Sequence, residues 1–129
     1  MKVLIDTNAY SHLLDGDQSV RDLLSRATKV YVSSIVLGEL QTGFKCGSKD
    51  RKNREMLDRF LSKSTVEVVD VTAETAEVYA SIMDSLRKIG KPIPTNDVWI
   101  AAHATEVGAA VLTFDKHFTS IPGLRLALS

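Results

Sequence analysis

Short apolar runs that end in polar or acidic residues recur along the chain. Val3-Leu4-Ile5 is followed directly by Asp6, and Val30-Tyr31-Val32 is followed by Ser33 and then by a helical stretch that carries Glu39. Uninterrupted apolar runs rich in β-branched residues are typical of strands that are covered on both faces, as in parallel sheets. The pattern therefore predicts buried strands whose carboxyl ends meet polar groups.

Three further runs extend this pattern towards the end of the chain. Ala110-Val111-Leu112 is followed by Thr113 and Asp115, residues 66–69 alternate weakly, and a last strand is expected near residues 124–128. Between the runs, apolar residues recur every three or four positions, as in amphipathic helices. These helical stretches are predicted near residues 7–14, 20–27, 34–44, 48–61, 72–89 and 97–107.

Capping residues set most of the expected helix ends. Thr7 or Asn8, Ser33 or Ser34, Ser48 and Thr72 are expected to cap helix starts, and Gly108 is expected to close the helix that follows Asp97. Because helices alternate with strands, the sequence predicts an α/β fold with a central, mostly parallel sheet of four or five strands. Its length of 129 residues favours one domain that spans residues 1–129.

Acidic residues are expected to gather at one edge of this sheet. In open α/β sheets, ligands bind outside the carboxyl ends of the strands. Asp6, Glu39, Asp97 and Asp115 each follow a strand or lie early in a helix, so they can converge there. Any one of them alone is as easily a helix cap or a turn residue, and Asp97 is favoured by the helix dipole in any case.

Several carboxylates in one pocket would destabilise the protein or be partly protonated unless a cation lies among them. Two of them about 4 Å apart repel by roughly 4 kcal/mol at an effective dielectric constant of 20. Oxygen ligands without a cluster of His or Cys favour Mg²⁺ or Mn²⁺ over Zn²⁺. Such ions polarise phosphoryl oxygens and activate water, so the pattern points to metal-assisted phosphodiester hydrolysis.

Composition excludes little. Lys plus Arg and Asp plus Glu both number 16, the hydrophobic fraction is 44%, and Cys46 is the single cysteine. We expect a cytoplasmic protein, because Asp6 interrupts the initial apolar run and no stretch has the roughly 18 apolar residues that a membrane span needs. Two basic clusters are candidate phosphate-binding surfaces, although such runs are more often solvated faces: Lys45, Lys49, Arg51, Lys52 and Arg54, and then Arg87, Lys88 and Lys91.

Other polar residues give weaker signals. His103 lies about 240° around its helix from Asp97 and so should not share the acidic site. We expect His12 and His117 at the surface or half-buried, and Trp99 in packing or a subunit contact. Gly38 and Gly43 weaken their helix by up to ~1 kcal/mol each relative to Ala, which suggests close backbone packing or the approach of a ligand.

Four segments, in order, resemble the motifs of the PIN-domain nucleases, particularly the VapC-like toxins of toxin–antitoxin pairs. The segments are Val3-Leu4-Ile5-Asp6-Thr7-Asn8, Ser33 to Leu40 with Gly43, Asn96 to Ala104, and Leu112-Thr113-Phe114-Asp115-Lys116-His117-Phe118. Each motif is short, but together they cover essentially the whole chain.

The resemblance implies a three-layer PIN-like domain and an endoribonuclease that depends on Mg²⁺ or Mn²⁺. It assigns metal binding and catalysis to Asp6, Glu39, Asp97 and Asp115, with Asp115 at the least uniform of these positions. Thr7, Asn8 and Thr113 would support these groups or contact the substrate. It also implies an RNA substrate, a homodimer and a small inhibitory antitoxin as partner.

Three other interpretations stay open. A receiver-type phosphorylation domain would have an acidic pair after its first strand, which Asp6-Thr7-Asn8 fits poorly. A haloacid-dehalogenase-like phosphatase would have an Asp where Asn8 stands. A PIN-like module that binds RNA or protein without turnover is compatible with every motif.

Overall fold

The computed structural model describes residues 1–127, which form a single sheet surrounded by helices. The elements in chain order are β1 (Lys2–Ile5), α1 (Thr7–Leu14), α2 (Gln18–Arg26), β2 (Lys29–Ser33), α3 (Ser34–Cys46), α4 (Asp50–Leu61), β3 (Val66–Val69), α5 (Ala73–Lys88), α6 (Thr95–Val107), β4 (Ala110–Leu112), the 3-10 helix η1 (Lys116–Ser120) and β5 (Leu126–Ala127). The expected strand at 124–128 is therefore shorter than predicted, and its last residue lies outside the described part of the chain.

All the strands run parallel, in the order β3-β2-β1-β4-β5. The chain starts in the middle of the sheet, moves outward through β2 and β3, and then returns to the other side of β1 with β4. Val3 is thus opposite Val30 on one side and Ala110 on the other. A reversal of this kind leaves a crevice beyond the carboxyl ends of the two central strands, which is where doubly wound proteins bind ligands.

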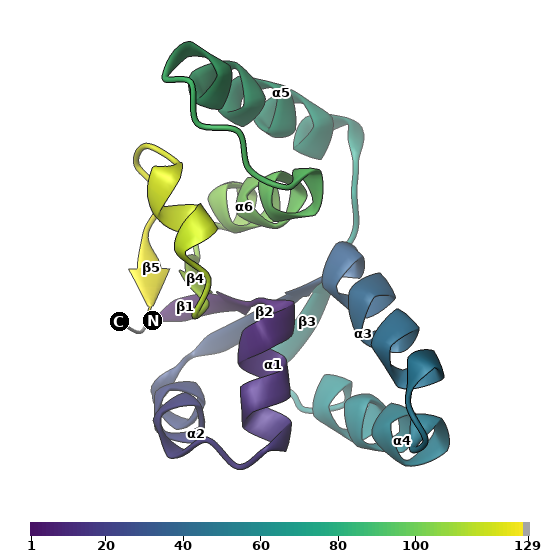
Figure 1. The fold of residues 1–129 in the computed structure, drawn as a ribbon. Coiled ribbons are helices and arrows are strands. Elements are labelled where there is room, and N and C mark those ends of the chain that lie inside the picture. Colours follow the sequence, from purple (N-terminus) through teal and green to yellow (C-terminus); the bar gives the residue numbers. More distant parts are fainter. Residues whose placement is uncertain (128–129) are drawn as a thin grey trace.

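Helices cover both faces of the sheet (Figure 1). α6 lies on one face with α5 packed outside it, while α1 and α2 lie on the other face. α3 and α4 pack against each other beside β2 and β3. This is the predicted three-layer α/β fold with a parallel sheet. Among residues 1–127, no helix is both long and apolar enough to cross a bilayer.

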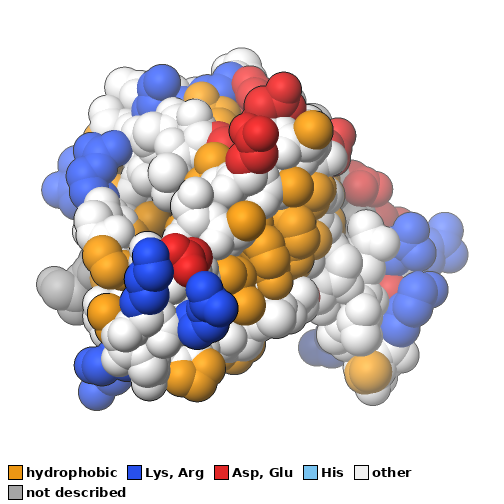
Figure 2. Space-filling model, turned by 90° about the horizontal axis from the view of Figure 1, so that it is seen from above, with side chains coloured by type: hydrophobic (Ala, Val, Ile, Leu, Met, Phe, Trp, Pro, Cys, Tyr) orange, Lys and Arg blue, Asp and Glu red, His pale blue; other side chains and the backbone are white. Residues whose placement is uncertain are grey.

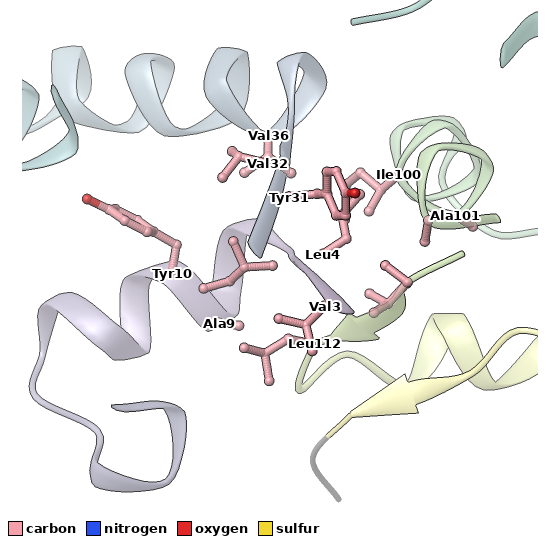
Figure 3. Close-up of a cluster of buried hydrophobic side chains, with 14 of the residues drawn as sticks. Val3, Leu4, Ala9, Tyr10, Tyr31, Val32, Val36, Ile100, Ala101 and Leu112 are labelled. Carbon is pink, nitrogen blue, oxygen red and sulfur yellow. The ribbon is translucent and has the colours of Figure 1, made fainter. Parts of the chain in front are cut away.

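The core explains why the strands carry uninterrupted apolar runs. Val3, Leu4 and Ile5 are completely buried. Figure 3 shows Leu4 directed towards Ile100 of α6, whereas Val3 points to the opposite side of the sheet. Because both faces are covered, neighbouring strand positions must all be apolar.

Most predicted helix ends are confirmed, and two are wrong. Ser33 caps α3, Thr72 caps α5, and Gly108 closes α6 in the left-handed conformation at φ 69°. Ser48 does not cap α4, which begins at Asp50 without a side-chain cap. Thr7 and Asn8 lie inside α1, because Asp6 is itself the cap.

The face of the molecule at α5 is partly apolar. Viewed from that side, hydrophobic side chains gather in a patch beside acidic ones (Figure 2). α5 and the connector after it line a groove of about 770 Å³ that includes Tyr79, Met83 and Ile93. Trp99 stacks on Tyr79 with ring centroids 3.9 Å apart, so its role is packing between α6 and α5.

Candidate metal centre

A pocket of about 400 Å³ lies beyond the carboxyl ends of β1 and β4. It is lined by the four predicted carboxylates and by polar residues of α1, α6 and the segment after β4. The lining residues are Asp6, Thr7, Asn8, Glu39, Pro94, Thr95, Asn96, Asp97, Ile100, Asp115 and His117. Four segments that are distant in sequence therefore meet at the switch point of the sheet.

Asp6 is the most buried carboxylate of the pocket, with 4% of its surface exposed. Its Oδ1 accepts the backbone N–H of Ala9 at 2.8 Å, which caps α1. Its Oδ2 accepts a hydrogen bond from the hydroxyl of Thr113, and that hydroxyl in turn accepts the N–H of Asp115 at 2.8 Å. Thr113 thus lies behind the pocket and joins its first and last acidic positions.

Glu39 reaches the pocket from the second turn of α3. Its Oε1 accepts the hydroxyl of Thr7 at 2.5 Å, and its Oε2 accepts the side-chain amide of Asn96 at 3.4 Å. These contacts span 32 and 57 residues of sequence. Thr7, which follows Asp6, and Asn96, which precedes Asp97, therefore hold the carboxylate of Glu39 in place.

Asp97 and Asp115 share one histidine. The Nδ1 of His117 lies 3.0 Å from Oδ2 of Asp97 and 3.1 Å from Oδ1 of Asp115. Asp115 also accepts the backbone N–H of His117 at 2.9 Å, which caps η1 and turns the ring inward. Suitable ligand atoms of these three residues all lie within 4.8 Å of one another.

Burial and mutual repulsion make the pocket unfavourable for negative charge. Burial is the main cause that raises the pKa of Asp6, and the charges of Asp97 and Asp115 raise it further. Burial likewise raises the pKa of Asp97, to which Asp115 and Glu39 contribute. A bound cation would offset both effects.

The residues fit a hard divalent ion. The donor set consists of carboxylate oxygens with one imidazole nitrogen, which suits Mg²⁺ or Mn²⁺. Cys46, the soft ligand of the chain, is exposed and does not line the pocket. Asp97, Asp115 and His117 have the spacing of ligands to one ion, and Asp6 and Glu39 line the same pocket.

Sequence reasoning missed His117 as part of the pocket. Its side chain is half exposed, as expected, but it bridges two of the predicted acidic residues. The available signal was its position two residues after Asp115, where a short capped turn returns the ring to the carboxylate. His103 behaves as predicted, because it lies outside the pocket, buried against Ser33.

The fold and the pocket together define a class: a parallel α/β domain with an acidic crevice at its topological switch point. The chain belongs to the PIN domain family, whose model matches residues 3–124.

Named relatives agree with this assignment. The chain is 34% identical to "Ribonuclease VapC2" of Rickettsia felis, in an alignment that covers 98% of this chain and 96% of the relative. It is 29% identical to "tRNA(fMet)-specific endonuclease VapC" of Salmonella typhimurium, over 98% and 96% of the two chains. A chain in the crystal structure of VapBC2 from Rickettsia felis, bound to a promoter DNA fragment, superposes with a TM-score of 0.86 at 32% identity, with 98% of both chains covered.

Proposed function

We propose that this protein is a VapC-type ribonuclease that cleaves RNA phosphodiester bonds internally with the help of Mg²⁺ or Mn²⁺. The observation that supports this most strongly is the pocket itself, in which Asp6, Glu39, Asp97 and Asp115 meet at the sheet edge of a PIN domain. The names of the relatives indicate RNA as the substrate class.

Asp6, Glu39, Asp97 and Asp115 are the residues that would hold the ion. When bound, a divalent ion supplies charge for the phosphoryl oxygens and lowers the pKa of a bound water. Thr113 and the Ala9 amide fix the carboxylate of Asp6, and Thr7 fixes that of Glu39. The protein thereby holds its ligands in place before substrate arrives, which reduces reorganisation during the reaction.

Asn8 and Asn96 provide the remaining polar groups of the pocket. Asn8 is exposed at the rim, so its amide is positioned for the RNA rather than for the ion. Asn96 donates to Glu39 and supports that carboxylate. We assign substrate contact to Asn8 and support of the acidic groups to Thr7, Thr113 and Asn96.

The biological role proposed is that of the toxin of a VapBC-type pair, acting in the cytoplasm and inhibited by a small antitoxin. The likeness to a chain of the VapBC2 complex and to relatives named VapC supports this role. We also propose a homodimer and one domain over residues 1–129, in line with the family resemblance. Toxicity on expression, relieved by a small protein encoded next to this gene, tests the role.

The receiver-type alternative loses support from the pocket. A receiver domain would be expected to place a lysine beside its acidic residues, and no lysine lines this pocket within residues 1–127. A module that binds RNA without cutting it makes a different prediction from the enzyme, and the experiment below separates the two.

The test is cleavage of structured RNAs by the purified protein with Mg²⁺, with Mn²⁺ and with EDTA. We expect cleavage with either ion, none with EDTA, and a loss of at least 100-fold in Asp6→Asn and Asp97→Asn, because each removes a proposed ion ligand. Asp58→Asn is the matched control, since Asp58 is exposed on α4 and does not line the acidic pocket. RNA binding without cleavage would overturn the enzymatic proposal.

A further inference from the structure

A second groove opens directly beside the acidic pocket. It has a volume of about 570 Å³ and lies between α1, α3 and α4. Thr7 and Glu39 line both cavities, so the two are adjacent and share this hydrogen-bonded pair as their boundary. A chain that extends from the acidic pocket towards α4 would reach this groove next.

The charge of the two cavities differs. The acidic pocket contains four carboxylates and, within residues 1–127, neither Lys nor Arg in its lining. The second groove has two cations in its lining, Lys49 and Lys52 at the start of α4, together with two carboxylates, Asp15 and the shared Glu39. A polyanion repelled by the carboxylates therefore meets its nearest lining cations in this groove.

Lys49 and Lys52 are also available for binding. Both are exposed, and neither lies within 4 Å of a carboxylate oxygen in the described chain, whereas Arg51 pairs with Glu55. The second basic cluster differs, because both Arg87 and Lys88 pair with Asp84. The structure thus distinguishes two clusters that the sequence leaves equivalent.

The absence of a side chain at Gly43 leaves open space in the groove. It lies inside α3 and lines the groove, and a Cβ at this position would meet no atom within 4 Å. Close backbone packing, one of the two explanations that the sequence allows for this glycine, is therefore wrong. Open space beside Lys52 agrees with the other explanation, the approach of a ligand.

The floor of the groove suits a nucleotide. Leu40 and Phe44 of α3 and Met56 of α4 provide apolar surface, and Asn53 adds an amide beside the lysines. An apolar surface next to cations can accept both parts of a nucleotide, the base and the phosphate. The binding of a divalent ion alone would not require an apolar surface or lysine side chains.

We propose that this groove, between α1, α3 and α4, binds the RNA nucleotide next to the cleaved bond, with Lys49 and Lys52 on its phosphate. The proposal rests on the ribonuclease function above and assigns a direction to the RNA, from the acidic pocket towards α4. The site is a substrate subsite and contributes no ion ligand other than the shared Glu39.

The first test measures RNA binding. The probe is a fluorescein-labelled tRNA(fMet) transcript. It is titrated with the protein in buffer that contains Ca²⁺ and 50–200 mM KCl, and binding is followed by the fluorescence anisotropy of the probe. Lys49→Gln/Lys52→Gln should weaken binding roughly 10-fold at low salt. The slope of log affinity against log salt should fall by about 1.4, because each lost phosphate contact in a single strand accounts for about 0.7.

Two further variants give the test its controls. Lys2→Gln/Lys63→Gln removes the same charge at the opposite, amino edge of the sheet and should leave the slope unchanged. Gly43→Leu fills the groove while replacing a poor helix former by a good one, so we expect weaker RNA binding in a protein at least as stable. Equal RNA binding by wild type and Lys49→Gln/Lys52→Gln would overturn the proposal.

A small substrate separates this subsite from the proposed function. Bis(p-nitrophenyl) phosphate is a small phosphodiester that carries no neighbouring nucleotide to occupy the groove. The double lysine variant should hydrolyse it at the wild-type rate with Mn²⁺ while losing roughly 10-fold in kcat/KM on the tRNA. Failure of the wild type to hydrolyse either substrate would count against the ribonuclease itself, whereas equal loss on both substrates would count against the subsite.

Discussion

Thr7 donates its hydroxyl to Oε1 of Glu39 at 2.5 Å, and this contact joins the first helix to the third at the floor of the acidic pocket. A hydrogen bond to a charged group contributes about 1.5–3 kcal/mol. Its importance here is geometric, because Glu39 is on a helix that begins at the end of a different strand from the one that positions Asp6.

Replacing Thr7 should therefore affect the ion site more than the fold. We expect Thr7→Val to lower Mn²⁺ affinity and RNA cleavage roughly 10-fold, because Glu39 loses the donor that orients it. Thr7→Ser keeps the hydroxyl and should retain most activity. Mn²⁺ binding followed by electron paramagnetic resonance checks this directly, and a Val variant with wild-type affinity would contradict it.

Burial of Asp6 makes the ion-free protein less stable as pH rises. Its pKa is raised by burial, so the native state retains a proton that the unfolded chain releases near pH 4. Stability then falls as pH increases from about 4 through the raised pKa of the native state. At neutral pH in EDTA, Asp6→Asn should raise the melting temperature of the protein by a few degrees, because the buried charge is removed.

The same measurement in the presence of ions supplies the control. Mn²⁺ or Mg²⁺ should raise the melting temperature of the wild type and have a much smaller effect on Asp6→Asn. The comparison is best made between pH 4 and 8. Below that range Asp17 opposes the trend, because hydrogen bonds led by that from Ser19 lower its pKa to about 2. A wild type whose stability rose steadily from pH 5 to 8 relative to Asp6→Asn would contradict the argument.

His117 should tune the choice of ion. Its Nδ1 lies between Asp97 and Asp115, where a nitrogen ligand would favour Mn²⁺ over the harder Mg²⁺. We expect His117→Ala to reduce Mn²⁺ affinity several-fold and Mg²⁺ affinity less. His12→Ala is the control, since His12 does not line the pocket and contacts Asp17 and the ring of Phe114 instead. Competition of Mg²⁺ against bound Mn²⁺ gives the ratio, and an unchanged ratio would exclude this role.

The convergence of Asp6, Glu39, Asp97 and Asp115 could be predicted because it follows from topology. Alternation of strands and helices implies a parallel sheet, and a parallel sheet brings its carboxyl ends to one edge. The pattern does not depend on side-chain conformation, and a few misplaced helix caps leave it intact.

The missed features depend on conformation or on contacts between distant residues. The direction of the His117 ring is set by a five-residue 3-10 turn, and sequence periodicity does not describe such a turn. Asp6 serves both as the cap of α1 and as a pocket residue. The sequence pattern instead led to the prediction that Thr7 or Asn8 caps this helix. The groove beside Gly43 exists only because α4 packs against α3.

His103 links the two helices that carry Glu39 and Asp97. Its Nδ1 lies 2.8 Å from the hydroxyl of Ser33, 70 residues away, and its side chain is almost completely buried. Ser33 also caps α3 through the N–H of Ile35. The contact therefore fixes the start of α3 against the middle of α6, behind the acidic pocket.

A double-mutant cycle isolates this contact from the capping role of Ser33. Ser33→Ala, His103→Leu and the double variant should show a coupling energy of about 1 kcal/mol in the free energy of unfolding by urea. The single variants also lose the cap and the imidazole packing, but these losses cancel in the cycle. Strictly additive changes would mean that the hydrogen bond adds no stability. In that case the relative position of α3 and α6 is set by the buried apolar core, to which α3 contributes Val36 and α6 contributes Ile100.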